Sequence, residues 1–469
     1  MRLLMFESNL MLSEIESLGD RLFEFWQDFQ PCLRTQTRDS SAYGLDYLSG
    51  LLRMQTNRTM ANIGRQSQVD PQNMHHFMSN SPWSGPGLIG AVQAKVKQRS
   101  EFQSGAMLLV DESADQKGGD HSAGAGRQHN GRLGKVDMSQ VGVFVTLATP
   151  LVSTWIDGEL FLPEAWFEPA AAKRRTKAGI PVERTFQTKP ELAWLMIQRA
   201  QINGVPFAAV AMDTLYGRSR RLRFQLEAAG IEYYADVLAD TQVYLCRPQL
   251  LYPQTKRGKR AKHPIVRGRS YEVRSLALSQ HLQWQRITLR PSEQGYLTAD
   301  FARLPVWTLY NQTVRQEWLL IRLDDNRITY TLSNAAGATP LETMAWRKSH
   351  RYFAECSNRD SKSDLGWDEF QAIKYRAWQH QLAFTILASW FIAETRLDWA
   401  ARFQHDPALL AAYEVEVLPR LSMANVPELL RAAMPLPQLS PTEAALLVVN
   451  HLDNRIRSRK SRLRNKSSP

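Results

Sequence analysis

The chain has 469 residues and a formal net charge of +12, because 58 Lys and Arg outnumber 46 Asp and Glu. At about 150 residues per domain, this length predicts roughly three domains. A hydrophobic content of 43 % excludes a disordered or fibrous chain. The three cysteines are far apart and form no CxxC pair. This spacing argues against a disulfide framework or a structural zinc and indicates a reducing compartment.

The chain carries no pattern typical of export or of a membrane span. Its first residues lack the uninterrupted apolar core of a signal peptide. The most apolar window, residues 382–394, is shorter than the roughly 18 to 20 residues that a membrane-spanning helix needs. This window predicts a buried helix, and we expect no membrane association.

The first hundred residues predict helices. Residues 6–29 and 47–67 carry apolar side chains at spacings of three and four, the period of an amphipathic helix. Residues 68–87 then interrupt the pattern with several prolines and glycines. We therefore expect a helical module over residues 1–104.

The next part of the chain predicts a mixed α/β fold. Residues 105–113, 139–150 and 153–163 read as strands, residues 189–204 as a helix and residues 207–213 as another strand. The first and the last of these strands end in acidic residues. The glycine-rich residues between the first two strands predict a turn, because they lack the spacing of a P-loop or a dinucleotide-binding motif.

The rest of the chain predicts a β-rich insertion followed by helices. Residues 255–274 form a basic linker, and short strand-like pieces separated by turn signals follow it. Helical periodicity then returns, and residues 455–466 predict a disordered cationic arm with seven Lys or Arg. The five regions expected are residues 1–104, 105–262, 263–340, 341–400 and 401–469.

Two aspartates stand at the ends of predicted strands. If the strands of Asp111 and Asp213 belong to one sheet, their carboxylates emerge close together. Mg²⁺ prefers oxygen ligands and is often held by only one or two protein carboxylates, and bound metals activate nucleophiles in phosphodiester chemistry. The alternative is that each aspartate caps a turn or a helix, which is the commoner role of an acid after a strand.

A third group of charges recurs at helical spacing. Arg351, Glu355 and Lys362 lie four and seven residues apart, so they share one face of a predicted helix. Such a face suits a metal ligand flanked by phosphate contacts. An exposed face with one ion pair between residues four apart is the alternative.

Six segments match a known family in order and spacing: residues 75–83, 110–143, 155–167, 179–193, 211–237 and 351–388. They resemble the DDE-type insertion-sequence transposases, which are DDE superfamily endonucleases, and specifically the branch called insertion-sequence family 701, a relative of family 4. The resemblance covers most of the chain, and linked motifs are more specific than scattered acids.

The resemblance implies a ribonuclease-H-like catalytic core interrupted by a β-rich insertion, with a helical N-terminal DNA-binding domain and a helical C-terminal region. It assigns Asp111, Asp213 and Glu355 as the catalytic and metal-binding acids, with Mg²⁺ or Mn²⁺ as cofactor and two ions expected. Arg351 and Lys362 match the Arg and Lys of a family signature. The tyrosine of that signature falls on Lys348, which is a departure.

Clusters of basic residues predict contacts to DNA phosphates. Besides Arg351 and Lys362, the residues expected at the DNA backbone are Lys117, Arg127, Lys135, Arg218 and Arg221. A solvated charged face is the alternative for each cluster.

The function expected is a DNA transposase that cuts at inverted-repeat ends of an insertion sequence and joins them to target DNA. Its partners would be double-stranded DNA and a second copy in a synaptic homodimer, in the nucleoid of a bacterial cytoplasm. The alternative is a domesticated relative that recognises inverted repeats without cutting. A two-carboxylate glycoside hydrolase does not explain the basic clusters.

Overall fold

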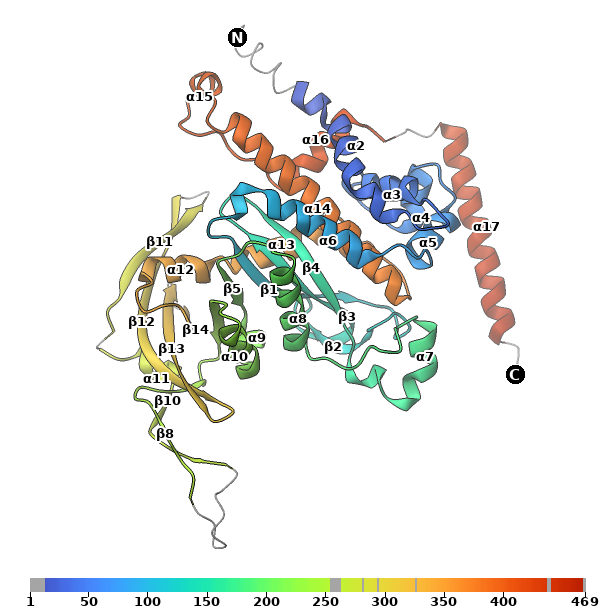
Figure 1. Cartoon of the computed structure of the whole chain (residues 1–469). Coiled ribbons are helices and arrows are strands. Elements are labelled where there is room, and N and C mark those ends of the chain that lie inside the picture. Colours follow the sequence, from blue (N-terminus) through green and yellow to red (C-terminus); the bar gives the residue numbers. More distant parts are fainter. Residues whose placement is uncertain are drawn as a thin grey trace.

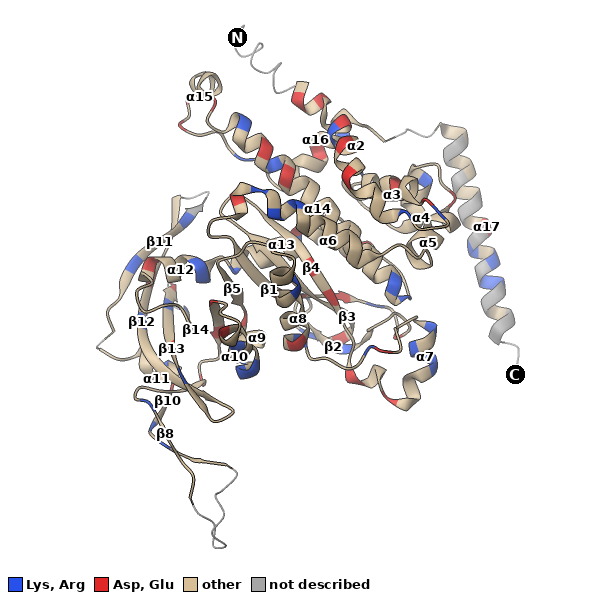
Figure 2. Cartoon of the chain, viewed as in Figure 1, with Lys and Arg blue, Asp and Glu red and all other residues tan. Residues whose placement is uncertain are grey.

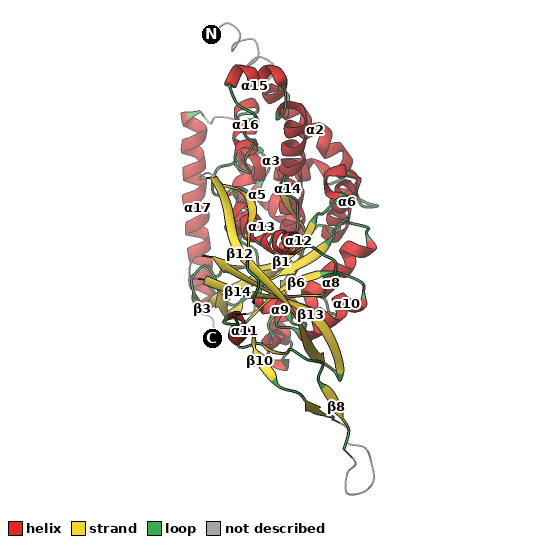
Figure 3. Ribbon diagram, turned by 90° about the vertical axis from the view of Figure 1, so that its left-hand side faces the viewer, coloured by secondary structure: helices red, strands yellow, loops and turns green. Residues whose placement is uncertain are grey.

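The computed structural model describes residues 13–253, 263–280, 282–292, 295–324, 327–436 and 440–466. Within these ranges the chain is a mixed α/β structure built on one large sheet, with the N-terminal helices, α14 (Tyr375–Phe403) and α16 (Asn425–Ala433) gathered at one end (Figure 1). Turned by 90°, the molecule has its N-terminal helices at the top and the small strands β8 and β10 at the bottom (Figure 3).

Five strands form the centre of the sheet in the order β4-β3-β1-β5-β6. Strands β4, β3 and β1 pair antiparallel, whereas β1, β5 and β6 pair parallel. This arrangement is consistent with the ribonuclease-H-like core that the sequence resemblance implied. The bounds are β1 Met107–Gln116, β3 Lys135–Ala148, β4 Ser153–Phe161, β5 Ala209–Met212 and β6 Tyr233–Val237.

The central strands are apolar along continuous runs because neighbouring elements cover them. All four residues of β5 are buried, as are the last ten residues of β3. Such runs are typical of strands covered on both faces. Helices α8 (Lys189–Ile202), α13 (Tyr352–Ser363) and α14 (Tyr375–Phe403) contact this part of the sheet.

The glycine-rich residues 124–135 are more ordered than the sequence predicted. They contain strand β2 (Gly126–Asn130), which pairs antiparallel with β3. The turn expected there is confined to residues 131–134, where Gly134 takes a positive φ of 63°. The expectation of a simple turn was therefore wrong, because the polar residues between the glycines pair with an extended β3.

The β-rich insertion continues the core sheet beyond β6. Strand β14 pairs antiparallel with β6, and the sheet then runs through β13, β12, β7 and β10, with β11 added on β12. Their bounds are β7 Gln242–Tyr244, β10 Ser270–Glu272, β11 Gln285–Ser292, β12 Gly295–Tyr310, β13 Thr313–Asp324 and β14 Arg327–Ser333. A separate ladder joins β8 (Gln249–Leu251) to β9 (Ile265–Arg267). Residues 255–262 of the predicted basic linker lie outside the described residues.

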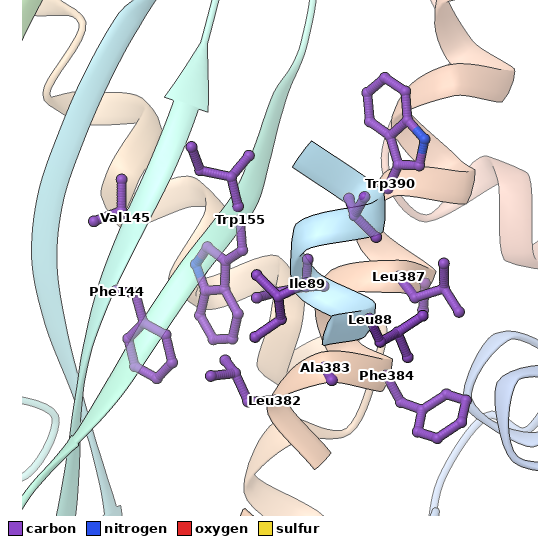
Figure 4. Packing of buried hydrophobic residues seen from close by; sticks show 14 of the residues in the cluster. Leu88, Ile89, Phe144, Val145, Trp155, Leu382, Ala383, Phe384, Leu387 and Trp390 are labelled. Atoms are coloured by element: carbon purple, nitrogen blue, oxygen red, sulfur yellow. The ribbon is translucent and has the colours of Figure 1, made fainter. Parts of the chain in front are cut away.

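The N-terminal helices pack on α14 and share one hydrophobic core with the central sheet. Leu88 and Ile89 of α6 lie against Leu382 and Phe384 of α14, close to Trp155 of β4 (Figure 4). The helical module expected over residues 1–104 therefore packs as part of the same hydrophobic core as the central sheet. Its helices are α2 Leu18–Phe29, α3 Ser41–Arg53, α4 Met60–Gln66, α5 Pro71–Ser79 and α6 Gly85–Gln98.

Short helices complete the chain. They are α7 Ala172–Lys177, α9 Thr214–Gly217, α10 Arg220–Ala228, α11 Val273–Ala277, α12 Leu341–Ser349, α15 Pro407–Tyr413 and α16 Asn425–Ala433. No helix among the described residues is long and apolar enough to cross a membrane.

The basic C-terminal segment differs from its prediction. Residues 455–466, expected as a disordered arm, belong to helix α17 (Pro441–Lys466). The segment between Pro441 and Pro469 holds no proline or glycine, and Arg and Lys are good helix formers. The seven basic residues therefore belong to a helix that begins in the apolar residues before them.

Candidate active site

Asp111 and Asp213 lie at the same end of two neighbouring strands. Strands β1 and β5 are parallel, and the last registered pair is Val110 with Met212. Asp111 is the next residue of β1, and Asp213 is the residue that follows β5. The parallel pairing thus brings together two carboxylates that are about a hundred residues apart in sequence.

Backbone N–H groups hold both carboxylates. Asp213 is the N-cap of α9, and its Oδ1 accepts hydrogen bonds from the N–H groups of Leu215 and Tyr216. Asp111 Oδ1 accepts the N–H of Glu112 at 2.8 Å. Asp213 therefore does cap a helix, which was the alternative role considered from the sequence. This role is compatible with its position beside Asp111.

The two aspartates repel each other in a partly desolvated site. Burial, followed by the charge of Asp213, raises the pKa of Asp111 to about 7. Burial, together with nearby Glu112, also raises the pKa of Asp213. A divalent cation between two such carboxylates would relieve the repulsion, and one or two carboxylates are the usual protein share of a Mg²⁺ site. This donor set fits the metal that the family implies.

Glu355 lies on α13 and is bound to an arginine rather than to the aspartates. Its side chain is 53 % exposed, and Oε1 is 2.5 Å from Nη2 of Arg351, the N-cap residue of the helix. Arg351 Nε also lies 3.5 Å from Asp236 Oδ2. In the described ranges, no three His, Cys, Asp or Glu residues are grouped so as to hold one ion. The structure thus brings together two of the three predicted acids, whereas the third pairs with Arg351, whose other partner is Asp236.

Sequence reasoning missed Asn358, which contacts the first aspartate directly. Its Nδ2 donates to Asp111 Oδ2 at 3.2 Å. Asn358 follows Glu355 by three residues, so both side chains lie on the face of α13 that also carries Arg351. The available signal was this helical spacing, but an uncharged amide does not stand out beside the charges of the segment.

Lys362 and Lys117 have partners within the protein. The Nζ of Lys362 donates to the carbonyl of Ala114 at 3.0 Å and lies 3.3 Å from Oδ1 of buried Asp115. Lys117 Nζ donates to the carbonyl of Phe370 at 3.4 Å, and burial lowers the pKa of this lysine. These contacts tie α13 and the following loop to β1, and they compete with the phosphate contacts predicted for both lysines.

Lys348, in the position of the signature tyrosine, is buried next to the site. Its ammonium lies 3.5 Å from Asp236 Oδ1, and Asp236 also contacts Arg351. Burial lowers the pKa of Lys348. Lys348 therefore pairs with Asp236, and the same carboxylate contacts Arg351.

Other acids near the site are already paired with cations. Glu112 Oε1 is 2.8 Å from Lys189 Nζ, and Asp360 pairs with Arg359. Both acids thus already have a cationic partner, as Glu355 does.

The remaining predicted DNA-binding residues are exposed. Arg127 and Lys135 lie on the β2–β3 hairpin, where Lys135 pairs with Asp137. Arg218 and Arg221 follow Asp213 and line a groove of about 690 Å³ with Lys189. Arg221 also pairs with Glu191 on the rim. The ribbon of α10 carries the blue of Lys and Arg in Figure 2.

Comparisons with known proteins agree on one kind of relative. Residues 28–296 match the family model described as DDE superfamily endonuclease. The chain is also 25 % identical, over 336 residues, to a protein of Microchaete diplosiphon described as "Probable transposase for insertion sequence element IS701". That alignment covers 68 % of this chain and 73 % of the relative.

Proposed function

Because this chain belongs to the DDE superfamily endonucleases, we propose that it is a transposase of the IS701 type. It cleaves DNA at the inverted-repeat ends of an insertion sequence and joins the ends to target DNA by metal-dependent phosphoryl transfer. The observation that carries the proposal is the parallel pairing of β1 with β5, which sets Asp111 beside Asp213.

The three acids of the proposal are Asp111, Asp213 and Glu355. When bound by these residues, Mg²⁺ or Mn²⁺ supplies Lewis-acid activation of water or a 3′-hydroxyl and stabilises the leaving oxygen. The two aspartates offer their oxygens at one point of the sheet. Glu355 joins them when a DNA phosphate takes its place on the guanidinium of Arg351, since both anions suit the same fork of donors.

Arg351 is the proposed phosphate contact next to the scissile bond. It already lies between the carboxylates of Asp236 and Glu355, so its guanidinium is held near the acids. A guanidinium there offsets charge on the phosphorane as it forms. Arg127, Lys135, Arg218 and Arg221 extend the DNA contact over the exposed surface, and binding should weaken steeply with salt.

The alternative remains a relative that binds inverted repeats without cutting. One observation favours it, namely the ion pair that engages Glu355 away from the aspartates. The intact pair of Asp111 and Asp213, each with a raised pKa, favours the enzyme. We also propose that residues 1–104 read the element ends and that two copies act together on two ends.

Cleavage of labelled DNA tests the proposal. Purified protein is incubated with Mg²⁺ and labelled duplexes that carry the ends of its own insertion sequence. The expected products are nicked or hairpin DNA and strand-transfer products. Asp111→Ala, Asp213→Ala and Glu355→Ala should each bind the ends without cutting them. Binding without cleavage by the unchanged protein would favour the non-cutting alternative.

A further inference from the structure

The side chain of Asn358 joins the candidate catalytic aspartate to the hydrophobic core. Its Nδ2 donates to Asp111 Oδ2 at 3.2 Å and to the carbonyl of Glu112 at 3.4 Å. Its Oδ1 accepts the indole N–H of Trp155 at 3.1 Å. We propose that Asn358 is a positioning residue that fixes the carboxylate of Asp111 for a divalent cation. This inference rests on the proposed function, in which Asp111 is a metal ligand.

The three partners admit only one orientation of the amide. An indole nitrogen is a donor and never an acceptor, so the oxygen of Asn358 must face Trp155. The oxygens of the Asp111 carboxylate and of the Glu112 carbonyl are acceptors, so the NH₂ group must face them. A flipped amide would place donor against donor at Trp155 and acceptor against acceptor at Asp111.

Trp155 is itself fixed by packing. Its side chain is fully buried, and its ring stacks on Phe144 with centroids 4.0 Å apart and planes 9° apart. The ring of Trp367 lies nearly perpendicular to it, with centroids 5.4 Å apart and planes 84° apart. Figure 4 shows Phe144 and Trp155 side by side on neighbouring strands. Because these rings cannot turn without disturbing the core, the indole N–H holds the amide in one direction.

Asp111 thus receives a separate donor on each oxygen. Oδ1 accepts the backbone N–H of Glu112, and Oδ2 accepts the amide of Asn358. A carboxylate oxygen can accept more than one contact, so both remain able to bind a cation while the plane of the group is fixed. Partners of this kind behind metal ligands typically change metal affinity by about 10- to 100-fold.

The alternative role of Asn358 is purely structural, namely to anchor α13 on the sheet. The neighbouring residue Ser357 allows the two roles to be distinguished. Ser357 Oγ lies 3.0 Å from Ser153 Oγ, so it also joins α13 to β4. Among the described residues, the hydrogen bonds to the Asp111 carboxylate come from Glu112 and Asn358 and not from Ser357. Ser357→Ala is therefore the matched control, because it removes an anchor of the same helix and leaves the Asp111 carboxylate alone.

The test is calorimetric titration of the full-length protein with Mn²⁺, alongside thermal melting without metal. Asn358→Ala should weaken Mn²⁺ binding about tenfold, and Ser357→Ala should leave it unchanged. Trp155→Phe removes the indole donor and should weaken binding less, in the same direction. It should have no further effect on binding in the Asn358→Ala background, because its action passes through the amide.

Several results would overturn the inference. These are unchanged Mn²⁺ affinity in Asn358→Ala, an equal loss in Ser357→Ala, or a full additive effect of Trp155→Phe in the double variant. If Asn358→Ala does not fold, unchanged affinity in Trp155→Phe alone refutes the inference. Asp111→Asn separates the two proposals. If it leaves Mn²⁺ binding intact, the metal site of the proposed function fails. If it weakens binding while Asn358→Ala does not, only the positioning role fails.

Discussion

At the scale of single residues, Asp111 links the pH dependence of stability to the candidate site. Its pKa is about 7 in the folded chain, through burial and the charge of Asp213, against an ordinary value of 3.8. Between these values the folded state binds the proton more tightly than the unfolded state, so this group lowers the stability of the metal-free protein as pH rises.

Replacement of this acid should therefore stabilise the metal-free protein at high pH. We expect Asp111→Asn to raise the melting temperature by a few degrees at pH 8 and by much less near pH 4, where the native carboxyl is protonated in the folded state and about half protonated in the unfolded state. Scanning calorimetry in chelator measures the two shifts. Equal shifts at both pH values would show that the burial of the ionised carboxylate and its repulsion with Asp213 are not the cause.

Lys362 should act on stability as well as on DNA contact. Its ammonium is the ion-pair partner of buried Asp115, and breaking a buried pair by removing one partner costs about 3 kcal/mol. We expect Lys362→Met to lower the free energy of unfolding by roughly this amount in urea titrations. The double variant Lys362→Met with Asp115→Asn should recover most of the loss. A stable single variant with impaired DNA cleavage would instead favour the phosphate contact.

At the scale of elements, a buried carboxylate binds the β-rich insertion to the core. Glu317 of β13 is completely buried and lies 3.1 Å from Arg223 Nε of α10 and 3.6 Å from Arg315 Nη2. Tyr233 of β6 donates its hydroxyl to the same carboxylate at 2.5 Å. These contacts, together with the β14–β6 pairing, predict that the insertion unfolds with the core.

Removal of this charge should destabilise the whole sheet. Glu317→Ala leaves the buried guanidinium of Arg223 without its counterion, while Arg315 keeps its pair with Glu227. An uncompensated buried charge costs about 3 to 5 kcal/mol, and we expect one cooperative transition at lower urea concentration. Asp300→Asn is the control, because its pair with Arg286 in the same insertion is exposed and should contribute less than about 1 kcal/mol. Separate transitions for the insertion and the core would contradict the coupling.

The elements that the sequence predicted well are those with an apolar period of their own. Strands β1, β3, β4 and β5 and helix α8 follow such runs. Strand β2 was missed because its pairing with β3 compensates for polar residues and flanking glycines. The disorder expected at the C-terminus was wrong because charge alone does not prevent a helix.

Local sequence patterns predicted individual residues of the candidate site but not the contacts between distant elements that assemble it. An acid after an apolar run marks Asp111 and Asp213, but their proximity depends on the parallel pairing of β1 with β5, which no local pattern contains. The role of Asn358 depends on Trp155, about two hundred residues away in sequence. The partners of Lys362 and Lys117 likewise lie on distant elements. The sequence therefore suggested DNA contacts instead, from helical spacing and the family signature for Lys362 and from the basic residues around the glycine-rich loop for Lys117.

At the scale of the whole molecule, the N-terminal helices and α14 depend on each other. Helix α14 is buried along most of its 29 residues, and its partners include α3, α5 and α6. The hydroxyl of Tyr47 on α3 donates to Gln381 Oε1 on α14 at 2.5 Å. Without residues 1–104, a large apolar face of α14 would be open to water.

A fragment of residues 105–469 should therefore aggregate or lose native structure. Size-exclusion chromatography and near-ultraviolet circular dichroism of the fragment and the full chain measure this. A monomeric, folded fragment would show that the helical module is an independent domain. If the fragment fails as expected, recognition of the element ends by residues 1–104 has to be tested with surface substitutions on α2 to α6 in the intact chain.

The central claim is that Asp111, Asp213 and Glu355 serve a common metal site. Iron(II) bound in place of Mg²⁺ reduces added hydrogen peroxide to hydroxide and a hydroxyl radical, which cuts the protein backbone close to the ion. With element-end DNA present, we predict cuts in the three segments around these residues, and loss of all three in Asp213→Asn. Cuts elsewhere in the chain, or an unchanged pattern in the variant, would contradict the account.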